Sequence, residues 1–223
     1  ASNGSVNAMH SSLSPLAGGV ALFNMLLGEI VFGGVGSGLY GMVAMIVLAV
    51  FLAGLMVGRT PEYLGKKIEA FEVKMAAVAV LVPCVAVLFG CAASFLTASG
   101  RAAVGNGGPH VLTEVLYAWA SMANNNGSAF GSLTATGDLY TWGGALAMLV
   151  GRFAGIVPLL ALAGSLAAKK TVPPSTGTFP TDGPLFATLL GGTILIVVAL
   201  THFPSLALGP VLEHLLLASG TTF

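Results

Sequence analysis

Long apolar stretches separated by short polar ones run through the whole chain. A helix needs about 20 residues to cross the hydrocarbon core of a bilayer. The stretches at 75–97, 141–168 and 185–200 are predicted to cross, and so is the region 14–57, although glycines interrupt it. A further apolar stretch at 111–123 has helical character but is too short to cross. This pattern predicts an all-α polytopic membrane protein.

The polar, glycine-containing segment 124–130 lies between the short helix and a full span. A half-length helix, a polar loop and a full span together are typical of a re-entrant pore loop, as in potassium channels. Non-helical backbone survives at membrane depth only where protein buries it or it lines a wet cavity. Its carbonyls would then replace the water around a cation, which the C-terminal end of the short helix also favours. The alternative is an ordinary turn, since Asn-Gly is a common turn signal.

An internal repeat favours the pore loop over the turn. A shift of 123 positions places Asn3-Gly4-Ser5 on Asn126-Gly127-Ser128, and the same shift places Met25-Leu26-Leu27-Gly28 on Met148-Leu149-Val150-Gly151. The chain is therefore predicted to contain tandem helix–pore loop–helix repeats. The first repeat begins at its filter, so we expect the natural chain to extend upstream. Further units are needed to close a ring around an ion.

The predicted boundaries divide the chain into three parts. The first repeat covers 1–73, with a filter at 1–7, a broken second span at 14–57 and a polar loop at 58–73. The second repeat covers 74–170, with its first span at 75–97, pore helix at 111–123, filter at 124–130 and second span at 141–168. Residues 171–223 form a loop, a last transmembrane helix and a short tail.

Glycines crowd the second span of the first repeat and make one uniform helix improbable. They are Gly28, Gly33, Gly34, Gly36, Gly38 and Gly41. We expect an unwound loop near mid-membrane, which would line a cavity or form a gate. The alternative is a continuous helix whose glycine face packs closely on its neighbours. The stretch 36–41 fits a dinucleotide-binding pattern, but no strand precedes it, so no organic cofactor is expected.

Composition and charge fix the predicted orientation. The chain is 56% hydrophobic and only 7% charged, whereas soluble domains carry about 25% charged residues. Alternating the crossings collects most loop cations on one side: Arg59, Lys66, Lys67, Lys74, Lys169 and Lys170. The positive-inside rule makes that side cytoplasmic, so both filters are predicted to face outward. The net charge is zero, and there is no basic patch for nucleic acid.

Two charges fall inside predicted spans, at equivalent positions of the repeat. Glu29 and Arg152 are related by the same shift of 123, just beyond their filters. A charge at membrane depth is costly and marks a pathway or a pair. One hypothesis is an ion pair across the pore. In another, Arg152 donates to carbonyls of the glycine loop and holds it as a gate. The third is a buried pair without a role in transport.

Other chemistry is absent from the sequence. The four histidines lack metal-ligand spacing, and Cys84 and Cys91 are interpreted as core residues. No phosphate-binding loop or aspartyl-phosphate motif occurs, so the chain is not expected to be an enzyme by itself.

Three strings resemble one known family over the length of the chain. They are Ser2-Asn3-Gly4-Ser5, the run 124–130, and 58–67, which reads Gly-Arg-Thr-Pro-Glu-Tyr-Leu-Gly-Lys-Lys. They are similar to the C-terminal part of the potassium-binding component of the bacterial Kdp potassium pump. The resemblance implies four repeats around one filter, of which the third, in part, and the fourth are present.

The resemblance also implies a site and partners. The filter would take K⁺ from outside through Ser2, Asn3, Gly4, Asn125, Asn126 and Gly127. The loop that contains Gly33, Gly34, Gly36 and Gly38 would lie below it, with Arg152 approaching. The ion would pass to the B subunit of the pump, which is a P-type ATPase that uses ATP, in a complex with the C subunit and a small peptide in the bacterial inner membrane. The rival hypotheses are a channel or secondary transporter driven by ion gradients, coupled through Glu29, and a structural scaffold.

Overall fold

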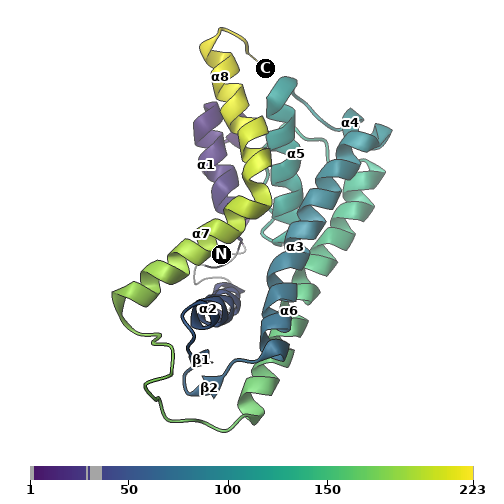
Figure 1. Ribbon diagram of the computed structural model, residues 1–223. Coiled ribbons are helices and arrows are strands. Elements are labelled where there is room, and N and C mark those ends of the chain that lie inside the picture. The colour runs from purple at the N-terminus through teal and green to yellow at the C-terminus, as the bar shows by residue number, and fades with distance from the viewer. Residues whose placement is uncertain (1–2, 29, 31–36, 223) are drawn as a thin grey trace.

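The computed structural model describes residues 3–28, 30 and 37–222. Within them the chain is mostly helical (Figure 1). The α-helices are α1 (Pro15–Leu26), α2 (Ser37–Met56), α3 (Ala70–Leu96), α4 (Ala98–Ala102), α5 (Gly108–Ala123), α6 (Gly144–Ala168), α7 (Gly183–Leu206) and α8 (Leu212–Ala218). A 3₁₀ turn, η1 (His10–Ser12), precedes α1, and π-helical turns η2 (Leu139–Gly143) and η3 (Ala207–Val211) precede α6 and α8. Strands β1 (Glu62–Tyr63) and β2 (Lys66–Lys67) form an antiparallel hairpin.

Four helical stretches are long and apolar enough to cross a membrane. They are Gly38–Met56, Ala70–Leu96, Leu139–Ala168 and Gly183–Ala218. Large apolar side chains point outward along them, including Phe89, Leu160 and Leu200, each more than half exposed. In water such a surface would be unfavourable, whereas in a bilayer it is the normal outer face. The prediction of a mostly helical, polytopic membrane protein is confirmed.

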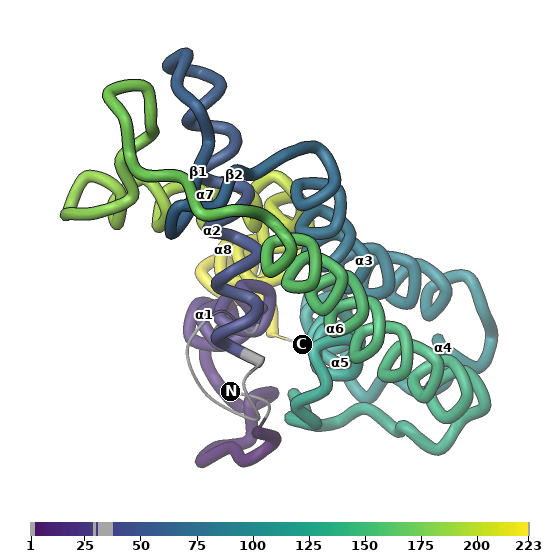
Figure 2. The backbone as a smooth tube through the Cα atoms, turned by 90° about the horizontal axis from the view of Figure 1, so that it is seen from below, coloured from purple at the N-terminus to yellow at the C-terminus, as the bar shows by residue number. Residues whose placement is uncertain are grey.

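The short helix α5 is the most buried helix of the described part. It packs against α3, α6 and α1, and α3 and α6 lie side by side along their length (Figures 1 and 2). Val115, Leu116 and Ala120 of α5 are fully buried. Trp119 lies on Gly90 of α3, where a side chain would overlap its ring, and its Nε1 donates to Ser94 Oγ at 2.8 Å. These contacts fix α5 against the first span of its own repeat.

Several helix limits differ from the predicted ones. The first span of the second repeat begins at Ala70 rather than 75, because Glu69 and Glu72 form a capping box there. The short helix begins at Gly108 rather than 111. The region 14–57 contains two helices, which end at Leu26 and resume at Ser37.

The last helix is longer than the crossing predicted at 185–200. The helix continues from Gly183 to Ala218 and bends at η3, so α7 and α8 differ in direction (Figure 1). Pro204 lies in the last turn of α7 and Pro210 lies within the π-helical turn η3, and the helix continues through both.

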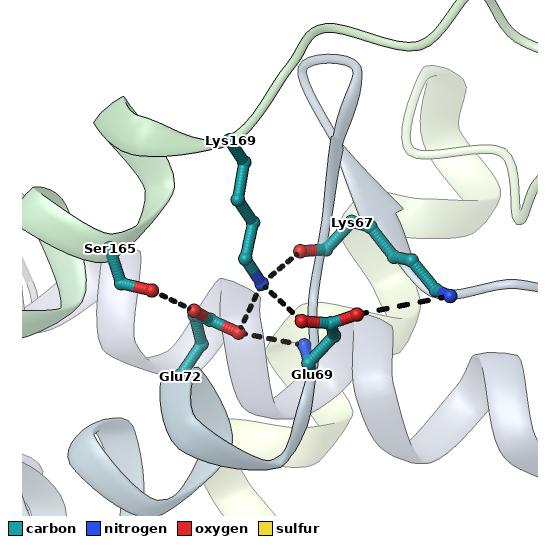
Figure 3. Close-up of polar contacts among 5 residues, drawn as sticks. All are labelled: Lys67, Glu69, Glu72, Ser165 and Lys169. Carbon is teal, nitrogen blue, oxygen red and sulfur yellow. Dashed lines mark hydrogen bonds and ion pairs between the residues drawn. The ribbon is translucent and has the colours of Figure 1, made fainter.

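At the end of the structure opposite α8, Lys169, Glu69, Glu72, Ser165 and the Lys67 carbonyl form a cluster of polar contacts, which we call the clamp (Figures 1 and 3). Here the β hairpin lies beside the segment that joins α6 to α7, as Figure 2 also shows. Val172 N donates to Gly65 O at 2.8 Å, and Thr60 N donates to Gly177 O at 2.9 Å. Lys66, Lys67 and Lys169, which the sequence placed on one side of the membrane, therefore lie at one end.

Lys169 is the centre of this clamp. Its Nζ bonds Glu72 Oε2 at 2.7 Å, Glu69 Oε2 at 3.1 Å and the Lys67 carbonyl at 2.9 Å (Figure 3). Ser165 donates to the other oxygen of Glu72, which is fully buried. Burial alone would lower the pKa of Lys169, but the two carboxylates outweigh it and raise that pKa. The clamp therefore holds the ends of α3 and α6 together with the hairpin.

Replacing Lys169 with Met is expected to destabilise the complete protein by about 2–4 kcal/mol, because it leaves the Glu72 carboxylate buried without its cation. The Lys169 amine stabilises the fold fully below pH 10.5, the ordinary lysine value, and loses its effect as the pH rises through its higher folded pKa. Thermal unfolding in detergent measures the loss, with Lys170→Met as the neighbouring control. Equal melting temperatures for the two variants would contradict the clamp.

Candidate functional site: two glycine loops at the end of a short helix

The site begins where α5 ends. Asn124 caps the helix, and the two following residues fold back on its last turn, with Asn125 N donating to Met122 O at 3.1 Å and Asn126 N to Ser121 O at 3.2 Å. Asn125 and Gly127 have positive φ, 57° and 79°, which reverses the chain. The partial negative charge at the helix C-terminus therefore faces the loop and attracts a cation.

The first loop packs directly on this second one. A Cβ added to Gly4 would lie 2.8 Å from the Asn126 carbonyl oxygen and 3.0 Å from that of Gly127. Only a glycine permits such backbone contact, because any side chain at Gly4 would displace the opposite peptide. The two Asn-Gly-Ser strings, 123 residues apart in the sequence, thus lie side by side in space.

Both loops form the same local hydrogen bond. Ser5 N donates to Asn3 Oδ1 at 2.9 Å, and Ser128 N donates to Asn126 Oδ1 at 3.0 Å. Each asparagine thus bonds the backbone two residues on, as in an Asx turn. This bond occupies the side-chain oxygens of Asn3 and Asn126 within the protein.

Two neighbouring asparagines connect the second loop to α1 and to α6. Asn124 Nδ2 donates to the Met25 carbonyl of α1 at 3.1 Å, and Asn125 Nδ2 donates to the Met148 carbonyl of α6 at 3.0 Å. Met25 and Met148 are the methionines that the repeat places at the same position. The amide nitrogen of Asn125 and the amide oxygen of Asn126 therefore have structural partners, and the backbone carbonyls of this loop are the groups that we consider as ion ligands.

Glycine also allows α6 to approach the end of α5. A Cβ at Gly151 would overlap the carbonyl of Ala123, the last residue of α5. The equivalent residue of the first repeat, Gly28, has φ 73° and lies near the Asn124 side chain. The loop is thus held at the end of α5 by glycine contacts from both repeats.

A cavity of about 130 Å³ lies on the far side of these asparagines. Asn124, Asn125, Gly28, Gly151 and Arg152 line it, and mostly apolar residues of α1, α2, α3, α6 and α7 form the rest of the wall. The cavity can hold several water molecules. Arg152 contributes a cation to its lining, and its role in a pathway stays a prediction. Gly38 is buried in the first turn of α2 and is not among the lining residues.

Five of the predicted site residues lie outside the described residues: Ser2, Glu29, Gly33, Gly34 and Gly36. The pairing of Glu29 with Arg152 and the unwound glycine loop therefore stay predictions.

Two residues contribute to the site in ways that the sequence did not predict. His202 lies in α7, is 2% exposed and lines the cavity. The hydroxyl of Tyr117 bonds Ser128 in the second loop at 3.0 Å. The one available signal was the position of Tyr117 two helical turns before the loop, on the face that also carries Ser121.

The chain matches the family model described as "Potassium-transporting ATPase A subunit" over residues 1–215. It belongs to this family. A relative from Sorangium cellulosum is 65% identical over 215 residues, which are 96% of this chain and 37% of that protein. One from Methylobacterium radiotolerans is 60% identical over 223 residues, 100% of this chain and 39% of that protein. Both relatives are named potassium-transporting ATPase potassium-binding subunit, and the chain spans less than two fifths of their length.

For this family member, the close approach of α6 to α5 predicts a sharp difference between two glycines of one helix. Gly151→Ala is expected to destabilise the complete protein by about 1–3 kcal/mol, because the added methyl group displaces the end of α5. Gly155→Ala, one turn later and facing open space, is expected to be neutral or stabilising by up to about 1 kcal/mol. Thermal unfolding compares the two. A Gly151→Ala protein as stable as the Gly155→Ala protein would show that the contact is not tight.

Proposed function

We propose that this chain forms half of a potassium-selective filter and belongs to the potassium-binding component of an ATP-driven uptake complex. The observation that carries the proposal is the contact of Gly4 with the Asn126–Gly127 peptide at the C-terminal end of α5. Two loops with the same sequence and the same hydrogen bond meet there, as expected of neighbouring units in a ring. Two upstream units of the same protein would complete the ring around the ion.

Backbone carbonyls of the two loops are the proposed ion ligands. Their side-chain oxygens are bonded within the protein at Asn3 and Asn126, and carbonyls are the groups that replace the hydration shell of K⁺ in filters. K⁺ is the substrate, and the ligands come from Ser2, Asn3, Gly4, Asn125, Asn126 and Gly127. The dipole of α5 adds attraction for a cation without adding a fixed charge that would hold it.

The proposed path continues below the filter. The ion would enter from the extracytoplasmic side, because the lysines of the clamp mark the opposite end as cytoplasmic. It would then reach the cavity that Arg152 lines and pass to the B subunit, the P-type ATPase that hydrolyses ATP. The C subunit and a small membrane peptide would complete the complex. A gradient-driven carrier would need Glu29, which lies outside the described residues, and family membership favours the ATPase assignment.

Rubidium tests the filter directly. In the intact complex with Rb⁺ in place of K⁺, we expect strong anomalous density in direct contact with the backbone carbonyls of Gly4 and Gly127. Rb⁺ is a useful substitute because it is a slightly larger alkali cation with many more electrons. An empty filter, with density beside Glu29 instead, would contradict the proposal and favour a carrier.

Replacing Arg152 with Met separates a pathway charge from a structural pair. If Arg152 acts in the pathway, the complex should assemble and melt normally, while the rate of ion uptake changes at unchanged half-saturating K⁺. If Arg152 only pairs within the fold, the buried partner left alone should prevent assembly. Uptake by reconstituted vesicles measures the rate, and Arg101→Met, an exposed cation of α4, is the control.

A further inference from the structure

We propose that Tyr117 and Ser128 determine ion selectivity by holding the second filter loop from behind, without touching the ion. This inference rests on the proposed function, since it assigns a role to residues around the same loop. It starts from a chain of three side chains that connects α5 to the loop: Tyr117, Ser128 and Asn126.

The direction of the hydrogen bonds in this chain follows from its donors. Ser128 Oγ donates its single proton to Asn126 Oδ1 at 2.8 Å. The Tyr117 hydroxyl, 3.0 Å from Ser128 Oγ, must then be the donor to Ser128. Consecutive bonds of this kind polarise and strengthen one another. Tyr117 therefore acts on Asn126 through Ser128.

Asn126 has no free side-chain group with which to bind an ion. Its Oδ1 also accepts from Ser121 Oγ at 3.0 Å and from Ser128 N at 3.0 Å, so three donors share two lone pairs. Its Nδ2 contacts the sulfur of Met25 at 2.8 Å. Rotating the amide toward the pore would break all of these contacts, so Asn126 supports the loop rather than coordinating the ion through its side chain.

Tyr117 and Ser128 are buried, and neighbouring rings hold the Tyr117 ring in place. Tyr117 is 2% exposed and Ser128 is 6% exposed. The Tyr117 ring packs against Phe130 at 5.3 Å and meets the edge of His10 at 5.4 Å between ring centroids. Water is thus excluded from this packed site, and removing the tyrosine hydroxyl would leave the Ser128 oxygen without its donor.

Gly127 is the residue that this chain controls. It lies between Asn126 and Ser128, both fixed by the bonds above. Because Gly127 has no Cβ, its own side chain does not restrict its backbone, which has a φ of 79°. In the first loop, Asn3 Oδ1 accepts one bond, from Ser5 N, among the described residues. The Gly4 backbone instead rests on the supported loop. Fixing the carbonyls of 126–127 therefore fixes the contact surface of both loops.

A cation filter discriminates through the size of its carbonyl cage or through the number and field strength of its carbonyls. Either property depends on loops that hold their shape around an ion of the wrong radius. We therefore expect loss of the support to relax discrimination between ions, while every ligand stays present.

The test is Tyr117→Phe in the intact complex, with Tyr140→Phe as the matched control. Tyr140 is also buried, beside Trp119, but its hydroxyl makes no hydrogen bond to either loop among the described residues. ATP hydrolysis is measured against K⁺ and against Rb⁺, and the ratio of half-saturating concentrations gives the discrimination. Tyr117→Phe is expected to raise half-saturating K⁺ about three- to tenfold and to bring the ratio closer to one, at an unchanged maximal rate.

The control and a second variant make the result decisive. Tyr140→Phe should stay within about twofold of the parent protein in both quantities. Ser128→Ala removes the middle of the same chain, so its effect should match that of Tyr117→Phe and the double variant should add little. This variant also carries the test if Tyr117→Phe does not assemble. Unchanged discrimination in an assembled variant would overturn the inference and leave the filter assignment intact. A parent complex without cation-dependent ATP hydrolysis would overturn both.

Discussion

Contact between backbones at the end of α5 is the constraint on which the rest of the structure depends. Gly4 lies on the Asn126–Gly127 peptide, and Gly151 lies on the carbonyl of Ala123. Neither contact has room for a Cβ, so glycine is required at both places. The long helices, the cap at Asn124 and the two loops can adopt their positions only because these backbones meet without side chains between them.

Such contacts explain how the irregular backbone after α5 is held within the fold. Each free carbonyl there must find a partner in the protein or in water. Asn124 and Asn125 provide partners to Met25 and Met148, one in each repeat, and so join the loop to the helices below it. The same two asparagines line the cavity. Asn124 and Asn125 therefore both bond the neighbouring helices and line the cavity.

The sequence predicted the elements of this arrangement better than their connections. Hydropathy located the spans, and the repeated Asn-Gly-Ser string identified both loops, because these signals are local. The Tyr117–Ser128 bond and the buried position of His202 depend on which helix faces which, and no local pattern encodes that. The predicted crossing at 185–200 is shorter than the observed helix for another reason: Pro204 and Pro210 disfavour a helix in isolation, and neither interrupts it in the structure.

Among the described residues, no carboxylate lies at the loops, so the orientation of the backbone carbonyls becomes important. Glu114 is buried in α5, but it accepts from Asn106 at 3.1 Å, away from the loops. The groups left to attract a cation are dipoles, those of the carbonyls and of the α5 terminus. A charge attracts from any direction, whereas a dipole attracts only when it is aimed. Where dipoles rather than charges attract a cation, the side chains that aim the carbonyls therefore matter as much as the carbonyls themselves.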